Sequence, residues 1–362
     1  MNDVTDTLPV GPRIQGDGIV FRFRDPDRDL ADVRLFQEIR RPRIGPDFTY
    51  DGSAGLWETR LPVPNADRLE YMIQVTHPDG GTEMITDPYN DKVAPGPFGD
   101  KSVFELPGYI PPAWMSKEAS EAGSIDKLEV KSRPLRARLP VLLWSPPGSG
   151  PSDELPLLIA HDGPEYAELS MLTRFLDVMT NENRIPSMRA ALVGPSDRDN
   201  SYSASAAYSR SLAHEIVPQL LAIAPTPHGR RMRMGMAASL GALAMLHAHR
   251  RSPATFGSLF LQSGSYFRQR WDKQESGFPR FRRISRFVGE VLTSEGWSHP
   301  ITATLTCGTV EENLANNRAT YAALERQGYE TKLVANRDGH NWVAWRDTFD
   351  PHLVDLIAGM WG

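Results

Sequence analysis

The chain has 362 residues, of which 40% are hydrophobic and 23% are charged, and its formal net charge at pH 7 is −5. This composition is ordinary for a soluble globular protein, the length favours two domains, and the absence of a basic stripe argues against a nucleic-acid partner. The single cysteine, Cys307, excludes an internal disulfide and fits a reducing compartment. The first residues lack the features of a secretion signal, and no run approaches the roughly 20 apolar residues of a membrane span. We therefore expect a cytoplasmic protein without a membrane partner.

Short runs of alternating apolar and polar residues occupy the first part of the chain. Examples are residues 18–24, 32–36 and 69–75, each followed by turn-forming residues. Alternation with a period of two is typical of antiparallel strands, and no helical pattern interrupts it. We predict an all-β sandwich domain over residues 1–106, followed by a Pro- and Ala-rich linker over residues 107–123.

From residue 124 onwards, predicted strands alternate with predicted helices. Some of the strands are continuous apolar runs, which are typical of strands buried on both faces of a sheet. The alternation predicts an α/β domain with a mainly parallel sheet over residues 124–362. In such a sheet the chemistry gathers in the loops after the carboxyl ends of the strands. The predicted strands are 127–133, 138–144, 155–160, 189–194, 233–238, 257–262, 301–306 and 330–335. The predicted helices are 166–179, 212–222, 239–246, 281–292, 314–326 and 352–360.

Residues 233–246 carry the pattern of a nucleophile elbow, in which a tight strand-to-helix turn exposes a serine hydroxyl. Ser239 is the serine, and the small residues Ala237 and Gly241 stand two positions before and after it. The usual pattern has glycine at both positions, so Ala237 is a departure, and it costs stability if that position requires a positive φ. The alternative interpretation is a serine that caps an apolar helix.

A serine nucleophile needs a base, normally a histidine that a carboxylate orients. In α/β-hydrolases these residues follow one another along the chain as serine, acid and histidine. Two predicted strands after the serine lead into loops that carry acids and then a histidine. We predict that Ser239, Glu311 and His340 form the catalytic triad, and Glu312 and Asp338 remain alternatives for the acid.

An oxyanion hole needs two backbone N–H groups directed at the developing negative oxygen. One is expected from Leu240, directly after the serine. The second belongs to the loop after the strand 155–160, where Pro164 has no N–H, so we assign it to Gly163, with Asp162 as the alternative. Residues 161–162 are not predicted to bind a metal, because two adjacent ligand types without partners make a poor metal site.

A set of segments spread along the chain matches the pattern of a known family. These are 161–163 with Tyr166, Arg198 ahead of 215–218, 238–241, 262–266, 308–311, 317–319, and 339–340 ahead of 345–346. On these residues the chain resembles the esterase-D-type branch of the α/β-hydrolases and, within it, the enterobactin (catecholate siderophore) esterases. The resemblance covers nearly the whole length, and the chain departs from the family pattern at Ala237 and Ala242. It implies an Ig-like (early-set) sandwich ahead of the hydrolase domain, the same triad, and Arg198 and Arg346 at the border of the site.

The resemblance implies hydrolysis of a small-molecule ester, namely a catecholate siderophore such as enterobactin or its ferric complex. No metal or cofactor is expected for the chemistry, and the sequence carries no signal for an oligomeric state. The alternatives are a carboxylesterase for other aryl, acyl, feruloyl or acetyl carbohydrate esters, and a binding protein that retains the fold without catalysis. Ser263 and Ser265 also follow a predicted strand and are expected to shape the pocket. The predicted substrate contacts are Arg198, Tyr202, Tyr266, Trp342 and Arg346.

Overall fold

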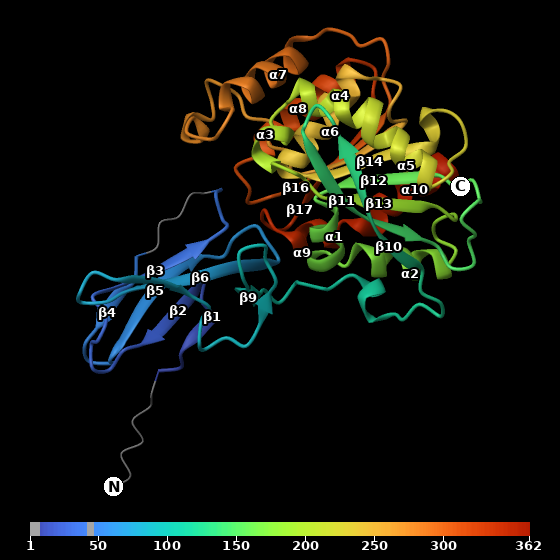
Figure 1. Cartoon of the computed structure of the whole chain (residues 1–362). Coiled ribbons are helices and arrows are strands. Elements are labelled where there is room, and N and C mark those ends of the chain that lie inside the picture. The colour runs from blue at the N-terminus through green and yellow to red at the C-terminus, as the bar shows by residue number, and fades with distance from the viewer. Residues whose placement is uncertain (1–7, 42–46) are drawn as a thin grey trace. The chain divides into compact units, whose positions relative to one another are not determined.

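The computed structural model describes residues 8–41 and 47–362, and the elements given below are those of these residues. The chain divides into two compact units (Figure 1). The first unit extends to Ile110 and includes two short segments from the far end of the chain, 308–312 and 337–341. The second unit comprises residues 111–307, 313–336 and 342–362.

Two antiparallel sheets make up most of the described part of the first unit. One has the order β1-β2-β5-β4, and the other has the order β3-β6-β9-β8 with β7 paired to β6. Apolar side chains of both sheets share one buried core, to which Phe21, Trp57 and Ile73 belong. The predicted strands 18–24, 32–36 and 69–75 are confirmed as β2, β3 and β6. The strands are β1 (Gly11–Gln15), β2 (Gly18–Arg24), β3 (Asp32–Gln37), β4 (Thr49–Asp51), β5 (Leu56–Pro62), β6 (Arg68–Thr76), β7 (Thr82–Ile85), β8 (Val93–Ala94) and β9 (Lys101–Glu105).

A mixed sheet forms the centre of the second unit, and among the described residues it has eight strands in the order β10-β11-β13-β12-β14-β15-β16-β17. The hairpin β10–β11 is antiparallel and joins β13 in antiparallel register. The strands β13, β12, β14, β15 and β16 pair in parallel. The strands are β10 (Ser124–Ser132), β11 (Ala137–Ser145), β12 (Leu157–His161), β13 (Arg189–Val193), β14 (Arg233–Ala238), β15 (Ser258–Gln262), β16 (Thr302–Gly308) and β17 (Glu330–Asn336).

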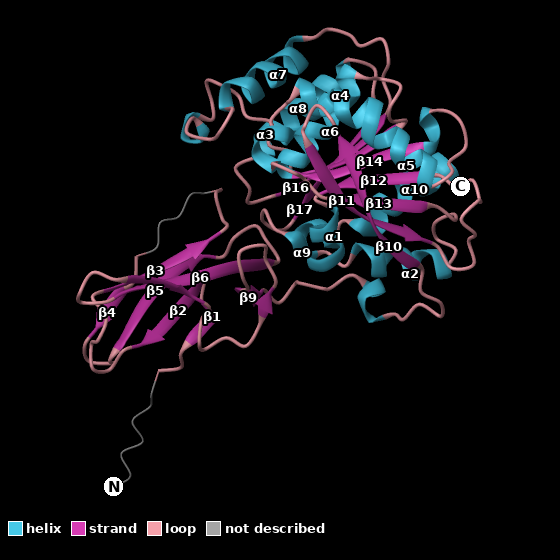
Figure 2. Ribbon diagram, in the orientation of Figure 1, coloured by secondary structure: helices cyan, strands magenta, loops and turns pink. Residues whose placement is uncertain are grey.

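Helices cover both faces of this sheet (Figure 2), which explains why inner strands such as β12 and β13 are buried along their whole length. One apolar core includes Leu243 of α6 and Val288 of α7, and the other includes Phe175 of α2 and Ile357 of α10. In the described part of the chain, no helix is both long and apolar enough to cross a membrane. The α-helices are α1 (Gly163–Leu169), α2 (Leu172–Asn181), α3 (Arg198–Tyr202), α4 (Ala206–Ser211), α5 (Val217–Ile223), α6 (Ser239–Arg251), α7 (Phe281–Thr293), α8 (Leu314–Arg326), α9 (Trp342–Asp347) and α10 (Val354–Trp361). The shorter helical segments are η1 (Ala113–Ser116), η2 (Leu212–Ile216), η3 (Arg230–Met232), η4 (Lys273–Glu275) and η5 (Phe349–Leu353).

Three of the predicted helices are divided in the structure. The one predicted over 352–360 begins within the segment η5 and continues as α10. The helix predicted over 166–179 is divided into α1 and α2, because Met171 adopts a left-handed backbone conformation with φ 55°. The helix predicted over 212–222 begins as the π-helical turn η2 and continues as α5. The short helices α3, α4 and α9 carry no long apolar period and were not predicted.

Candidate active site

Ser239 lies at the sharp turn between β14 and α6. Its backbone is left-handed, with φ 55°, whereas Ala238 before it is extended. A positive φ is uncommon for a residue with a side chain and is retained where the surrounding structure enforces it, often at functional sites. A helix-capping serine would instead occupy the N-cap position with extended backbone, and here Ala238 occupies that position. The geometry is therefore that of a nucleophile elbow and not that of a helix cap.

The small residues around Ser239 are explained by packing. A Cβ at Gly241 would lie 3.3 Å from the Cβ of Ala237 and 3.4 Å from a carboxylate oxygen of Asp162, so a side chain there would crowd both. Ala237 belongs to β14 and has the extended backbone of a strand. The methyl group of Ala237 therefore causes none of the strain that a positive φ would bring.

The two predicted oxyanion donors follow neighbouring strands, because Gly163 comes after β12, Leu240 comes after β14, and these strands are paired. Both residues lie in the first turn of a helix that has no side-chain cap. The first N–H groups of a helix have no acceptor within it and are suited to bind a negative oxygen. A Cβ at Gly163 would lie 2.1 Å from the carbonyl carbon of Leu192, so only glycine fits this position.

Arg198 holds the loop after β12 in place through Asp162. The Arg198 Nε lies 2.9 Å from Asp162 Oδ1, and one terminal nitrogen lies 2.8 Å from Oδ2, which is a two-pronged ion pair. The Asp162 side chain is 2% exposed and the Arg198 side chain is 38% exposed. Arg198, predicted as a substrate contact, therefore supports the loop, and part of its side chain remains accessible.

His161 is a packing residue beneath the same loop. It is fully buried, its Nε2 lies 2.9 Å from the Tyr208 hydroxyl, and its Nδ1 lies 3.3 Å from the Gly241 carbonyl oxygen. Burial lowers the pKa of His161 to about 3, so the ring is neutral at neutral pH. Tyr202 stacks on this ring, with centroids 4.7 Å apart, and is itself fully buried. The prediction of Tyr202 as a substrate contact therefore does not fit, because its side chain is part of the core.

The loop after β15 contacts the predicted nucleophile. The Ser265 N–H donates to the Ser239 carbonyl oxygen at 3.1 Å, and the two serine hydroxyl oxygens lie 3.2 Å apart. The Asn317 side chain holds this loop by bonding both the N–H and the carbonyl oxygen of Gly264, each at 3.0 Å. Tyr266 is fully buried, so its predicted role as a substrate contact does not fit either.

The predicted acid and base are paired within the first unit. The Nδ1 of His340 lies 2.8 Å from Glu311 Oε2, and the Gly308 N–H donates to Glu311 Oε1 at 2.7 Å. The Glu311 side chain is 1% exposed, whereas that of His340 is 34% exposed. Since Nδ1 faces the carboxylate, Nε2 is the atom that can accept a proton. Glu311 is thus the carboxylate paired with His340, whereas the alternative Asp338 has an arginine partner.

That partner is Arg68, the first residue of β6, which lies in a buried ionic cluster. Its guanidinium donates to Asp338 at 3.3 Å, to the Asn341 side-chain oxygen at 3.1 Å and to Glu70 at 3.0 Å. The Arg68 side chain is 3% exposed. Below, the Arg68 cluster denotes Glu38, Arg68, Glu70, Lys101, Asp338 and Asn341.

The Arg68 cluster holds three carboxyl groups and two cations. The second cation, Lys101, pairs with Glu38 and lies 3.6 Å from Glu70. Burial raises the pKa of Glu70 to about 7 and that of Asp338 to about 6, because the buried carboxylate form is poorly solvated. The cluster therefore takes up a proton more readily than exposed carboxylates do.

We expect Glu70→Gln to change how stability depends on pH. Between the ordinary value of 4.5 and about 7, folded Glu70 keeps a proton that the unfolded chain has lost, so rising pH destabilises the wild type through this window. Glutamine has no such proton, so the variant gains stability relative to the wild type between pH 5 and pH 8, by about 1–3 kcal/mol. Urea unfolding at both pH values measures the difference.

The matched control is Glu58→Gln, which removes a more exposed carboxylate from the same pair of sheets. A stability difference between Glu70→Gln and the wild type that is the same at pH 5 and pH 8 would contradict the assignment.

The two remaining predicted substrate contacts lie on α9. Trp342 is half-buried and packs edge-on against Tyr166 and Trp345. Arg346 is buried and pairs with its neighbour Asp347 at 2.8 Å. Trp342 thus keeps an accessible face, whereas Arg346 has its charge satisfied within the protein.

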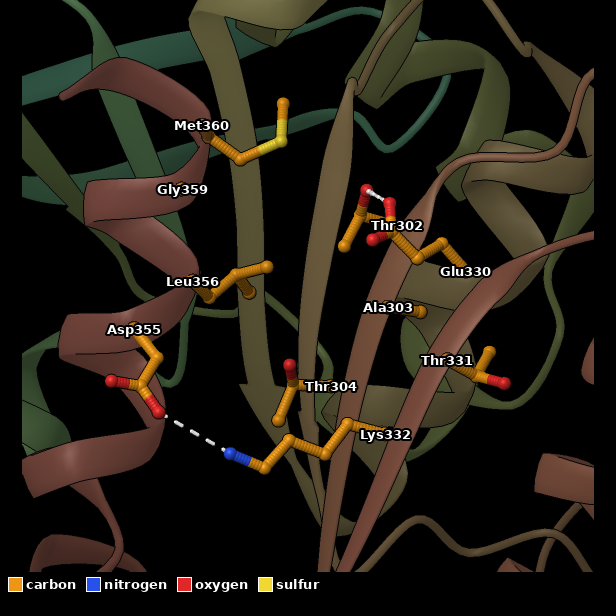
Figure 3. A pocket seen from close by; sticks show the side chains of 10 residues that line it. All are labelled: Thr302, Ala303, Thr304, Glu330, Thr331, Lys332, Asp355, Leu356, Gly359 and Met360. Atoms are coloured by element: carbon orange, nitrogen blue, oxygen red, sulfur yellow. Dashed lines mark hydrogen bonds and ion pairs between the residues drawn. The ribbon is translucent and has the colours of Figure 1, made fainter.

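A hollow of about 270 Å³ lies elsewhere in the second unit, between α10 and the first residues of β16 and β17 (Figure 3). Lys332 and Asp355 face each other across it at 3.3 Å. It lies at the amino ends of these strands, and it contains none of the predicted site residues. Among residues 8–41 and 47–362, no group of three or more His, Cys, Asp or Glu side chains is arranged to hold a metal ion.

The family model described as "Putative esterase" matches residues 132–356, which is more than half of the chain. The chain belongs to this esterase family. The esterase is 25% identical over 304 residues to the iron(III) enterobactin esterase of Escherichia coli O6:H1, a match that covers 81% of the chain and 72% of that protein. The resemblance inferred from the motifs, to esterases and within them to enterobactin esterases, is confirmed.

Solved structures show the same fold. The enterochelin esterase of Shigella flexneri aligns with a TM-score of 0.76 at 20% identity, covering 97% of this esterase and 96% of that chain. A ferulic acid esterase aligns with a TM-score of 0.57 at 15% identity, covering 67% of this esterase and 99% of that chain. The predicted α/β-hydrolase-type fold is thereby confirmed, with a sheet that is mixed and not wholly parallel.

Proposed function

We propose that this esterase hydrolyses carboxylic esters through an acyl intermediate on Ser239. The observation that carries the proposal is the left-handed backbone of Ser239 at the end of β14, in a chain of the esterase family. A residue with a side chain is held in this conformation only where the turn demands it, and the turn presents the hydroxyl beyond the sheet edge.

The order of the strands supports the choice of partners for Ser239. β14, β16 and β17 belong to one sheet, and Ser239, Glu311 and His340 follow them in the chain. Helix α8 connects β16 to β17, which is the kind of crossover that parallel neighbours need. Loops after the carboxyl ends of parallel strands gather at one edge, where the chemistry of such sheets takes place.

In the proposed reaction, His340 Nε2 takes the proton of Ser239 Oγ while Oγ attacks the ester carbonyl carbon. The backbone N–H groups of Leu240 and Gly163 stabilise the negative oxygen of the tetrahedral intermediate. The intermediate expels the alcohol, which takes the proton from His340, and leaves an acyl-serine. His340 then removes a proton from water as the water oxygen attacks the acyl carbon. The acyl bond to Ser239 breaks, His340 returns the proton to the Ser239 oxygen, and the free acid leaves.

The substrate we propose is an ester-linked catecholate siderophore, free or as its ferric complex, cleaved in the cytoplasm so that iron is released. Its support is the alignment with an iron(III) enterobactin esterase over 81% of the chain, whereas the ferulic acid esterase matches two thirds of it. The accessible part of Arg198 and the exposed face of Trp342 suit an anionic, aromatic ligand.

A comparison of substrates tests this proposal. We expect kcat/KM for a triscatecholate trilactone to exceed that for a feruloylated oligosaccharide by a factor of about 10² or more. Preference for the sugar ester would make the chain a carbohydrate esterase. Tight binding of the trilactone without hydrolysis of either compound would favour the non-catalytic binding protein.

A further inference from the structure

The loops that carry Glu311 and His340 are bonded to the amino-terminal sheets within the first unit. The carbonyl oxygen of Val310 accepts from the Arg40 N–H at 2.9 Å, and the Val310 side chain belongs to the core that the two sheets share. The carbonyl oxygen of Arg337 accepts from the Asp67 N–H at 2.7 Å. The acid loop is therefore bonded to the amino-terminal part of the chain next to Glu311, and the histidine loop is bonded to it three residues before His340.

The Arg68 cluster holds the histidine loop on both sides of His340. Arg68 bonds Asp338, two residues before the histidine, and Asn341, directly after it. Asn341 Nδ2 in turn donates to Glu38 at 2.9 Å and to Asp338 at 3.1 Å. Asp338 also accepts from the Gly339 N–H at 2.6 Å, so the short loop is bonded at every residue around His340.

These bonds join charged groups that are buried, so water does not solvate a charge that loses its partner. Arg68 is buried, and two of its three partners are carboxyl groups that are buried as well. Removing one partner of a buried ion pair leaves the other charge uncompensated, which costs several kcal/mol unless the surroundings shift. Without Arg68 the cluster has three carboxyl groups and one cation. We therefore expect the segment 338–341 to shift when Arg68 is removed.

We propose that Arg68 is a positioning residue for catalysis, which holds the loop 337–341 so that His340 keeps its productive orientation. The amino-terminal sheets are then part of the catalytic machinery. This inference rests on the proposed function, in which His340 is the base. A displacement of a catalytic group by about 1 Å can lower a rate by about 10²-fold, so the anchoring of the loop matters even though Arg68 touches no reacting atom.

The test compares Arg68→Gln, Arg68→Lys and the matched control Arg22→Gln in the full chain. Arg22 is a buried arginine of the same sheets, but its partners are Glu58 and Gln15, and it does not touch the histidine loop. With p-nitrophenyl acetate, we expect Arg68→Gln to lower kcat by about 10²-fold with KM within a factor of about two. Arg68→Lys retains the positive charge but lacks the planar guanidinium that bonds several partners at once, and it is expected to lower kcat by about tenfold. Arg22→Gln is expected to retain the wild-type kcat.

Nuclear magnetic resonance reports on the position of the His340 imidazole in the absence of substrate. In protein labelled with [15N]histidine, the proton on His340 Nδ1, bonded to Glu311, gives a signal that His340→Gln identifies by its loss. We expect this signal to shift or broaden in Arg68→Gln and to be unchanged in Arg22→Gln.

Wild-type kcat and an unchanged signal in folded Arg68→Gln would overturn the inference, and Arg68→Lys decides in the same way if Arg68→Gln does not fold. Equal rates for the wild type and Ser239→Ala would instead overturn the proposed function. The nuclear magnetic resonance signal would then still report whether Arg68 positions His340.

Discussion

Replacing Ser239 by alanine is expected to remove ester hydrolysis almost completely, lowering kcat by a factor of about 10⁴–10⁶. In the proposed mechanism the Ser239 hydroxyl oxygen forms the acyl bond, and no neighbouring group replaces it without rebuilding the turn. The Ser265 hydroxyl lies 3.2 Å away, but its residue stands in a different loop and has no elbow geometry. Release of p-nitrophenol from p-nitrophenyl acetate measures the loss.

The control is Ser285→Ala, which removes a buried hydroxyl from α7 of the same unit and is expected to retain the wild-type rate. A fluorophosphonate, which reacts with activated serines, is expected to label the wild type at Ser239 and to leave Ser239→Ala unlabelled. Hydrolysis at equal rates by the wild type and Ser239→Ala would remove Ser239 as the nucleophile.

The central strands and the elbow could be predicted because their signals are local. Several of the buried strands contain continuous apolar runs, and the turn at Ser239 is encoded by neighbouring small residues. The pairing of Glu311 with His340 was also predictable, because both residues follow strands of one sheet and the order along the chain restricts the choice. The sequence could not show that Asp338 pairs with Arg68 and not with His340, because Arg68 is 270 residues away from Asp338 in the sequence.

Other features had no local signal. The break at Met171 depends on a left-handed backbone at a residue that ordinarily favours helix. Tyr202 and Tyr266 were expected to contact substrate, but both are fully buried and serve the core. The roles of Asn317, which bonds both backbone groups of Gly264, and of Arg68 also depend on contacts distant in sequence.

Glu311→Gln is expected to lower kcat by a factor of about 10³–10⁴ while the fold is retained. The reason lies in the two oxygens of the carboxylate. The Gly308 N–H donates to Oε1, so it will hold the amide oxygen of glutamine in that place. The amide nitrogen must then face His340 Nδ1, where the wild type has the accepting oxygen Oε2.

An amide N–H donor at that place requires Nδ1 to be the acceptor, and the ring proton then resides on Nε2. A protonated Nε2 cannot remove the proton from Ser239, so the variant loses the base and not only the charge of the acid. The matched control is Glu312→Gln, the same change at the next residue, which is expected to retain the wild-type rate. The rate of p-nitrophenyl acetate hydrolysis decides between them. If Glu312→Gln loses activity and Glu311→Gln retains it, the carboxylate that orients His340 in the reaction is not the one paired with it here.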